Sequence, residues 1–165
     1  MLEAISLWLH ETTEGKILFT MLLSMMPVGE LRVGLPAGVA MGLPIPLAMF
    51  SSVVGNMIPV PFVIVFIRRI FKWTRVHVPR LNALIDRMEA RAYEKMKSKQ
   101  LVRYEAWGLL VFVAIPLPGT GAWTGALIAA LMDLRLKNAM PVIFIGVLIA
   151  CLIVTALTYG VTALL

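Results

Sequence analysis

Residues 27–34 read PVGELRVG and place two charged residues, Glu30 and Arg32, inside an otherwise apolar segment. Of the 165 residues of the chain, 60% are hydrophobic and 15% are charged. An ordinary soluble domain has about 45–50% apolar and about 25% charged residues. The composition is therefore typical of an integral membrane protein, and the two charges have to be explained by their position in lipid rather than as a surface turn.

The apolar residues fall into four blocks, at residues 17–47, 48–67, 107–132 and 139–165. A helix needs ~20 apolar residues to cross about 30 Å of hydrocarbon, because it rises ~1.5 Å per residue. Each block reaches this length. Residues 1–16 begin acidic where a cleavable signal peptide would begin basic. They predict a short interfacial helix with Ile5, Trp8 and Leu9 on its apolar side.

Positive charge is concentrated between the second and third apolar blocks. Residues 68–104 hold eleven of the fifteen Lys and Arg residues and three carboxylates, which gives a net charge of +8. The positive-inside rule assigns this basic segment, residues 68–105, to the cytoplasmic side of the cell membrane. Apolar residues recur at helical spacing from Leu81 to Ala92 and predict an amphipathic helix there. No nucleic-acid-binding module is recognisable, so we expect no nucleic-acid partner.

A shift of 91 residues superposes the two apolar halves of the chain, repeat 1 at residues 17–67 and repeat 2 at residues 106–165, without a gap. The matches with the most specific backbone effects pair Pro27 with Pro118, Gly34 with Gly125 and Gly55 with Gly146. Each repeat contains an interrupted apolar segment, a short break and a continuous span. Residues 1–165 are therefore predicted to form a single membrane domain with an internal repeat.

Each interrupted segment contains residues that break a helix: Pro27 and Gly29 in repeat 1, and Pro116, Pro118, Gly119 and Gly121 in repeat 2. Lipid offers no partner to the backbone groups that such a break frees, so both breaks should face protein or water. We expect each segment to enter the membrane and return as a re-entrant helical hairpin. Small residues follow each break, as Gly34, Gly38 and Gly42 and as Gly121, Gly125 and Ala129, and predict close helix packing.

Two topologies are compatible with these segments. Four full crossings would place Arg135 and Lys137 outside, against the positive-inside rule. Two re-entrant hairpins keep both residues and the basic segment inside, with both termini outside. The predicted fold class is therefore an all-α inverted repeat of two re-entrant hairpins, each followed by a transmembrane helix, with a cytoplasmic amphipathic helix between the halves. Many secondary transporters have such inverted repeats with broken helices.

Glu30 and Arg32 are the only charged residues in the four apolar blocks. A charge at the bilayer centre costs about 2.5–3.5 kcal/mol on insertion scales, so it is usually paired, hydrated or functional. Glu30 can exchange a proton, and Arg32 offers a planar fork to phosphate or carboxylate. The pair could equally be a static structural link or lie near the interface. Thr120 and Trp123 stand at the matching place in repeat 2, and all four residues are assigned to a substrate or proton pathway.

Enzyme chemistry finds little support in the chain. It has no Gly-x-Ser-x-Gly elbow and no cluster of Cys or His at metal-ligand spacing. His10 and His77 lie outside the apolar blocks, and Cys151 sits in an apolar run that suggests a packing role. We predict a protein that is not an enzyme and that needs neither a cofactor nor a metal.

The stretches MPVGELRVGLPAGVAMGLP, residues 26–44, and AIPLPGTGAWTGALIAALM, residues 114–132, resemble the small multidrug export protein family of bacteria and archaea. That family resembles the wider DedA superfamily. The resemblance implies two facing re-entrant hairpins and proton-motive-force-dependent transport or lipid flipping, including that of undecaprenyl phosphate. In the DedA motif Pro-x-Pro-Gly-Glu, Pro116, Pro118 and Gly119 are matched. Thr120 replaces the glutamate, and the acid of this chain, Glu30, lies in the other hairpin.

Two functions remain open from the sequence. The first is a transporter or flippase for an amphipathic substrate, with Glu30 favouring a drug-like cation and Arg32 favouring a polyprenyl phosphate or phospholipid. The second is a non-transporting membrane scaffold or assembly factor whose charged pair is structural. Membrane lipids are expected partners in both. Two spans and two hairpins surround little space, so we also expect a homodimer.

Overall fold

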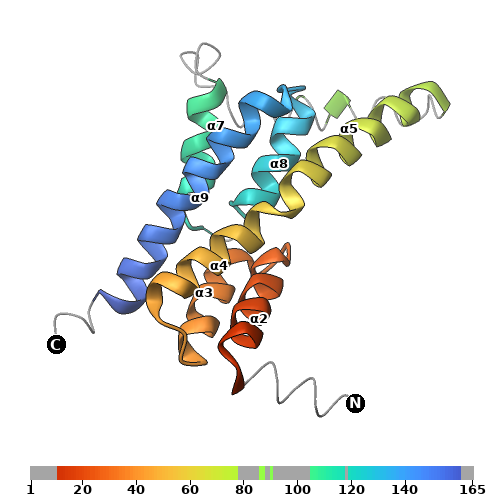
Figure 1. Ribbon diagram of the computed structural model, residues 1–165. Coiled ribbons are helices and arrows are strands. Elements are labelled where there is room, and N and C mark those ends of the chain that lie inside the picture. The colour runs from red at the N-terminus through yellow and green to blue at the C-terminus, as the bar shows by residue number, and fades with distance from the viewer. Residues whose placement is uncertain (1–10, 78–85, 88–89, 91–104, 118, 161–165) are drawn as a thin grey trace, which may run out of the picture. The chain divides into compact units, whose positions relative to one another are not determined.

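The computed structural model describes residues 11–77, 86–87, 90, 105–117 and 119–160 (Figure 1). All regular structure in these ranges is helical: α2 Thr13–Met25, α3 Glu30–Ala40, α4 Ile45–Met57, α5 Pro59–His77, α7 Glu105–Ala114, α8 Ala122–Leu131 and α9 Leu136–Tyr159. The interfacial helix predicted at residues 1–16 and the amphipathic helix predicted between Leu81 and Ala92 fall largely outside the described residues. Helix α5 runs to His77, so helical structure extends into the basic segment that the sequence places at residues 68–105.

The chain divides into two compact units. Unit 1 comprises Met1–Pro59 and Val147–Leu165, and unit 2 comprises Val60–Gly146. Each unit therefore contains one interrupted pair of helices, α2 with α3 in unit 1 and α7 with α8 in unit 2. The long helix α9 contributes its first part to unit 2 and its second part to unit 1.

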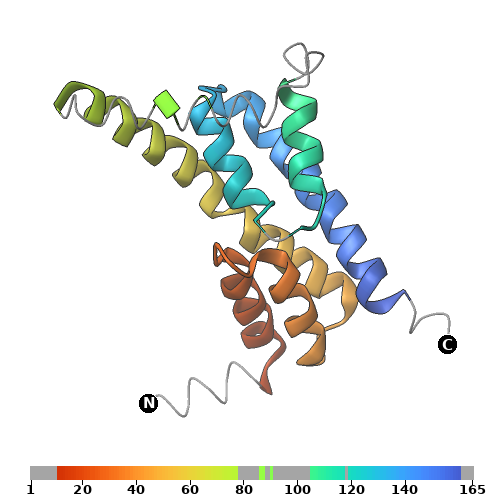
Figure 2. The same cartoon turned by 180° about the vertical axis from the view of Figure 1, so that it is seen from behind.

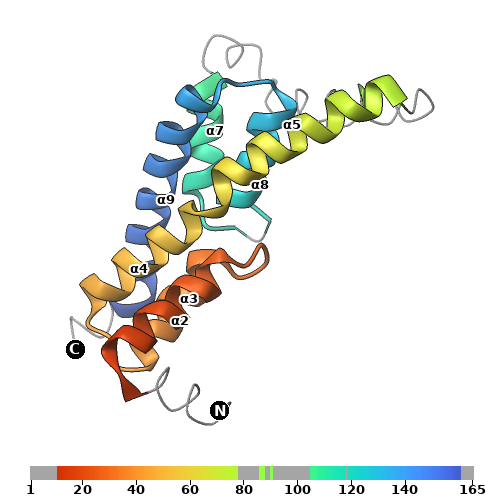
Figure 3. The same ribbon diagram turned by 45° about the vertical axis from the view of Figure 1, so that its right-hand side comes forward.

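Unit 1 is built on three helices, α2, α3 and α4, that pack against one another (Figure 3). Helix α2 begins after Thr12, whose hydroxyl accepts the backbone N–H of Gly15 at 3.1 Å and caps the helix. It ends at Met25, two residues before Pro27. Gly34 and Gly38 of α3 lie against Ser24 and Thr20 of α2, because a Cβ on either glycine would overlap those side chains. Small residues thus allow the two arms of the first hairpin to approach closely.

In unit 2, α7 and α8 pack against each other, and the first part of α9 contacts α7 at Gly146 (Figure 2). Gly125 of α8 and Gly146 of α9 both face Val113 of α7. A Cβ on these glycines would lie 2.5 and 2.8 Å, respectively, from the nearest atom of Val113. An alanine at Gly146 would collide with Val113 Cβ, which moves only with α7, whereas an alanine at Gly125 would collide with a methyl group of Val113. Close packing of the interrupted segment on the helix that follows it is therefore common to both units.

The turn after α3 and the turn after α8 have the same backbone hydrogen bonds at an offset of 91 residues. After α3, the N–H groups of Gly42 and Leu43 donate to the carbonyls of Val39 (2.8 Å) and Gly38 (3.0 Å). After α8, the N–H groups of Asp133 and Leu134 donate to the carbonyls of Ala130 (3.2 Å) and Ala129 (3.0 Å). Gly42 and Asp133 have φ angles of 86° and 52°, the left-handed conformation that ends many helices. Gly42, which the sequence places in a packing ladder, thus lies in the turn after α3.

Residues of α2 and α7, the first helices of the two pairs, correspond at an offset smaller than 91 residues. Gly34 and Gly55 meet Ser24 and Met21 of α2, whereas Gly125 and Gly146 meet Val113 and Leu110 of α7. The glycines are 91 positions apart, whereas the residues that they face in α2 and α7 are 89 positions apart. The chain between the facing positions of α7 and α8 is therefore two residues longer than the chain between those of α2 and α3. The gap-free alignment of the sequence misses this insertion.

Each long helix contacts the hairpin of the other repeat. In unit 2, Arg68 of α5 donates from Nη2 to the Leu134 carbonyl at 2.6 Å and lies 2.9 Å from Asp133 Oδ1. In unit 1, the Tyr159 hydroxyl of α9 lies 3.5 Å from the Pro36 carbonyl. Arg68 and Tyr159 are 91 residues apart, but their partners are not: Arg68 contacts the turn after α8, whereas Tyr159 lies near Pro36 inside α3.

Two stretches are long and apolar enough to cross a membrane, Ile45–Phe71, which joins α4 to most of α5, and Leu136–Tyr159, which is α9. Large apolar side chains remain exposed along both, among them Phe50, Phe62, Phe66, Leu152 and Leu157. Exposed apolar surface of this extent is unusual for a monomer in water. Acyl chains would cover it in a bilayer.

Candidate functional site

Glu30 is the buried acid of unit 1, with 4% of its surface exposed. It is the first residue of α3, where the positive end of the helix dipole favours a carboxylate. Its φ angle is 50°, a left-handed conformation that costs an ordinary residue roughly 1–2 kcal/mol. The N–H of Glu30 donates to the Met26 carbonyl at 3.0 Å and closes the loop that carries Pro27. Strain of this kind tends to occur at functional sites.

Arg32 lies in the first turn of the same helix and is partly buried. It interacts electrostatically with Glu30. Charges that are shielded from water interact much more strongly than charges on an exposed surface. The two charged residues that the sequence singles out are therefore coupled to each other at the start of α3.

Neutral polar side chains are also buried in unit 1, and the sequence did not lead us to them. They are Thr20 and Ser24 on α2 and Ser51, Ser52 and Asn56 on α4. Thr20 and Ser51 donate to backbone carbonyls one turn earlier, at 2.8 and 2.7 Å. The side-chain polar atoms of Ser24, Ser52 and Asn56 have no hydrogen-bond partner within the described ranges. Their signal in the sequence is the run SSVVGN, residues 51–56, which places two serines and an asparagine inside an apolar block.

Thr120 holds the loop between α7 and α8 in shape. Its hydroxyl accepts the N–H of Leu117 at 3.1 Å and lies 2.6 Å from the Ile115 carbonyl and 2.8 Å from the Leu117 carbonyl, either of which it can donate to. Gly119 and Gly121 flank it with φ angles of 80° and 145°. These values suit glycine, which has no Cβ. The side chain predicted for a substrate pathway therefore stabilises its own loop.

We expect Thr120→Val to lower the free energy of unfolding by about 1 kcal/mol, the net worth of a typical hydrogen bond in a protein. Thr120→Ser keeps the hydroxyl and should leave stability unchanged. Thermal unfolding of the purified protein in detergent, followed by tryptophan fluorescence, measures the difference. A Val variant that unfolds together with the wild type would show that the hydroxyl does not stabilise the loop.

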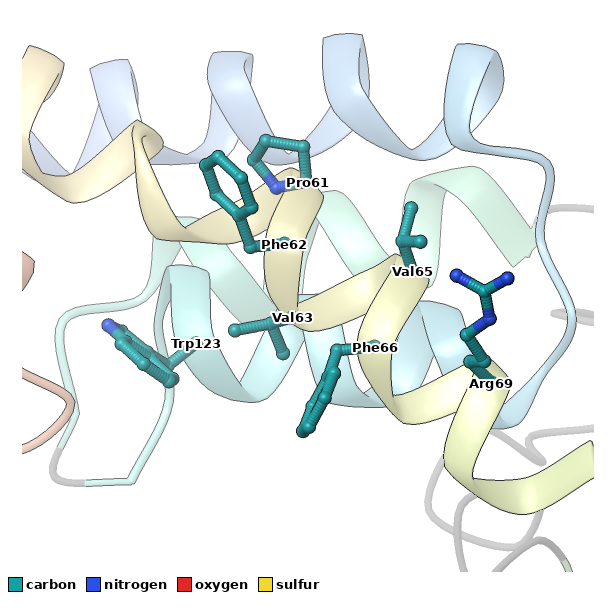
Figure 4. A pocket seen from close by; sticks show the side chains of 7 residues that line it. All are labelled: Pro61, Phe62, Val63, Val65, Phe66, Arg69 and Trp123. Atoms are coloured by element: carbon teal, nitrogen blue, oxygen red, sulfur yellow. The ribbon is translucent and has the colours of Figure 1, made fainter. Parts of the chain in front are cut away.

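Trp123 lines an apolar groove of unit 2 (Figure 4). The groove has a volume of about 600 Å³ and is lined by Pro61, Phe62, Val63, Val65, Phe66, Arg69 and Trp123. Arg69 is the charged residue of this lining, and Figure 4 shows it at the end away from Trp123. The volume is in the range of small-molecule sites. An amphipathic molecule would find apolar contacts and one cationic group here.

The predicted site residues fall into two groups. Glu30 and Arg32 belong to unit 1, whereas Thr120 and Trp123 belong to unit 2. Of the predicted break residues, Pro27 and Gly29 lie between α2 and α3, Pro116, Gly119 and Gly121 lie between α7 and α8, and Pro118 is outside the described residues. A shared cavity with one charged and one polar wall stays a prediction. The described part of the chain contains no group of three His, Cys, Asp or Glu residues that could hold a metal.

Comparison with protein families gives one match. The model of a family described as "Putative small multi-drug export protein" matches residues 30–153, about three quarters of the chain. The match begins at Glu30 and extends through α8 into α9. It confirms the resemblance drawn from the two Pro/Gly-rich stretches, whereas the relationship to the DedA superfamily stays a prediction. No curated protein and no solved structure matches the chain.

Proposed function

Because the chain belongs to the small multi-drug export protein family, we propose that it exports or flips an amphipathic substrate across the cell membrane and couples this movement to protons. The observation that carries the proposal is Glu30, a buried carboxylate in a strained backbone conformation that is coupled electrostatically to Arg32. A buried ionisable residue in an intramembrane segment is by default a candidate for a functional site.

We further propose that both interrupted segments are re-entrant. Their helices α2, α3, α7 and α8 have thirteen, eleven, ten and ten residues. At ~1.5 Å per residue, the longest reaches ~20 Å, short of the roughly 30 Å of a hydrocarbon core. Each pair of helices can enter the membrane and return, but within the described residues no single arm is long enough to cross it.

The contact between Arg68 and Asp133 supports re-entry of the second segment. Arg68 stands where the membrane-spanning stretch meets the basic segment, and Asp133 lies in the turn after α8, 2.9 Å away. With four full crossings these two residues would be on opposite sides of the membrane. A re-entrant second segment places both on the cytoplasmic side, in agreement with the positive-inside rule.

We also propose an inverted arrangement of the repeats, which the same stretch supports. The turn after α3 leads directly into Ile45–Phe71. The turn after α8 contacts Arg68 near the other end of that stretch. If Ile45–Phe71 crosses the membrane, the two hairpins open to opposite faces. Their breaks, with Glu30 in one and Thr120 in the other, would then lie toward the middle of the bilayer, where transporters bind substrates.

The electrostatic interaction of Glu30 with Arg32 offers a simple way to couple the movement of substrate to the movement of protons. Protonation of Glu30 removes the counter-charge of Arg32, so that the guanidinium can bind a phosphate or carboxylate of the substrate. An anionic substrate would then move in the same direction as the proton. A cationic substrate would compete with the proton for Glu30 and would move in the opposite direction. The direction of flux relative to the proton gradient therefore identifies the charge class of the substrate.

Purified protein in liposomes with an imposed pH gradient tests the proposal. One set of vesicles contains a fluorescent lipophilic cation, and the other a fluorescent short-chain polyprenyl phosphate. We expect gradient-dependent flux of one of the two probes, abolished by a protonophore. Flux of neither probe above that of protein-free vesicles would contradict the proposal and favour a membrane scaffold.

A further inference from the structure

Helix α5 has an exposed face on which two aromatic side chains are followed by a cation and then by an indole. Phe62, Phe66, Arg69 and Trp73 follow one another at spacings of four, three and four residues, which places them on one face of the helix. Phe62, Phe66 and Trp73 are 70%, 64% and 58% exposed. The first three of the four line the apolar groove of unit 2 to which Trp123 also belongs (Figure 4).

The neighbouring residues Arg68 and Arg69 differ in what their guanidinium groups contact. Arg68 is bound to the protein, since its Nη2 lies 2.9 Å from Asp133 Oδ1 and 2.6 Å from the Leu134 carbonyl oxygen. Arg69 is exposed and makes no ion pair or hydrogen bond with the residues that the structure describes. A guanidinium group presents a planar fork of donors that matches the oxygens of a phosphate. Arg69 therefore gives the apolar groove an end that suits an anion.

This face of α5 lies at the end of the membrane-spanning stretch Ile45–Phe71. Arg69 stands just before that end and Trp73 just after it, and arginine and tryptophan are both favoured at the level of the lipid headgroups. From Arg69 back to Phe62 the helix rises by about 10 Å, at ~1.5 Å per residue. One leaflet of a bilayer contains roughly 15 Å of hydrocarbon. The groove therefore fits within the depth of a single leaflet.

We propose that this groove binds one anionic phospholipid of the leaflet that adjoins the basic segment, with its phosphate on Arg69 and an acyl chain along Phe62 and Phe66. Basic residues at this depth attract anionic headgroups, and the lining residues in the described part of the chain include no acid that would repel one. A second copy of the chain fits less well, because the one acid of its four apolar blocks, Glu30, is buried. Lipid binding requires no transport, so this proposal and the proposed function can fail separately.

Trp123 allows the occupant of the groove to be measured, because bromine atoms on an acyl chain quench tryptophan fluorescence on contact. A full-length variant in which phenylalanine replaces Trp8, Trp73 and Trp107 keeps Trp123 as its one tryptophan. It is reconstituted into vesicles of equal parts phosphatidylglycerol and phosphatidylcholine, in which one lipid or the other is brominated. We expect phosphatidylglycerol to bind about fivefold more tightly, the preference that one basic residue near the headgroups confers. Native mass spectrometry of the wild type with both lipids gives the same comparison if this variant does not fold.

Arg69→Gln removes the charge and should abolish the preference, whereas Arg69→Lys keeps the charge and should keep most of it. Arg135→Gln is the matched control, because Arg135 is an exposed arginine of the same unit outside the groove lining, and it should keep the full preference. Equal quenching by the two brominated lipids while Arg69 is present would mean an ordinary lipid-facing surface and would overturn the proposal. Equal losses in Arg69→Gln and Arg135→Gln would overturn it too, as would quenching by neither lipid, which would mean that protein such as a second copy covers the groove.

Discussion

Glu30→Gln is expected to reduce proton-driven flux to the level of protein-free liposomes. Glutamine has nearly the same shape as glutamate and keeps hydrogen-bonding atoms at the start of α3, but it cannot take up or release a proton. Glu30 is buried and electrostatically coupled to Arg32, so loss of its charge changes the local field at the proposed site directly. Flux of both fluorescent probes across a pH gradient measures the effect. Glu30→Asp, which retains a carboxylate, should keep part of the flux.

Stability measurements on the same variants separate a functional pair from a structural one. If the pair only held the fold together, Glu30→Gln or Arg32→Gln alone would cost about 3–5 kcal/mol, the usual effect of removing one partner of a buried ion pair. The double variant would then recover stability. We expect instead that Glu30→Gln purifies as a folded protein without flux. A folded Glu30→Gln variant that transports like the wild type would contradict the assignment.

Gly55→Ala is expected to have the largest effect on stability. A Cβ at Gly55 would overlap the backbone carbonyl of Met21, where α4 crosses α2. A clash with backbone cannot be relieved by a change of rotamer, so α2 and α4 would have to separate. Overpacking costs typically 1–3 kcal/mol, and a backbone clash should bring the loss to about 3 kcal/mol.

Thermal and denaturant unfolding in detergent measure this loss. Ala40→Val adds volume at the exposed end of α3 and serves as the control, because surface substitutions usually change stability by less than about 0.5 kcal/mol. A Gly55→Ala variant that unfolds at the temperature of the wild type would show that α2 and α4 do not pack at this glycine.

Local backbone chemistry explains what the sequence could predict. Proline lacks an N–H and glycine tolerates left-handed φ angles, so the cluster of Pro and Gly at Pro27 and at Gly119 and Gly121 predicts breaks, whereas the single Pro36 and Pro141 lie inside α3 and α9. The helix pairs α2–α3 and α7–α8 are interrupted at these residues. The charged pair was also readable, because charges are rare and costly in apolar segments.

Contacts between residues that are distant in the chain could not be predicted from the sequence in the same way. The two-residue insertion between α7 and α8 shows only in which residues face Gly125 and Gly146. The role of Thr120 depends on the path of its loop, and the contact of Arg68 with Asp133 joins residues far apart in the chain. Serine in an apolar helix is ambiguous as well, because its hydroxyl can bond to its own helix, as Ser51 does.

Asn56 is an uncharged position at which the sequence is also informative. An amide has two donors and an acceptor, and a helix backbone rarely satisfies all of them. An asparagine in the middle of an apolar span is therefore informative even without a charge. Its burial without a partner became visible only in the folded chain.

The account depends on two hairpins that open to opposite faces of the membrane, and cysteine accessibility tests this most directly. In a Cys151→Ala background, single cysteines replace Pro44 and Arg135, which are exposed and correspond at the 91-residue offset. The account predicts that a membrane-impermeant maleimide labels residue 44 from outside intact cells and residue 135 only after permeabilisation. Labelling of both positions from outside would mean that the second segment crosses the membrane, which contradicts the proposed re-entrant topology.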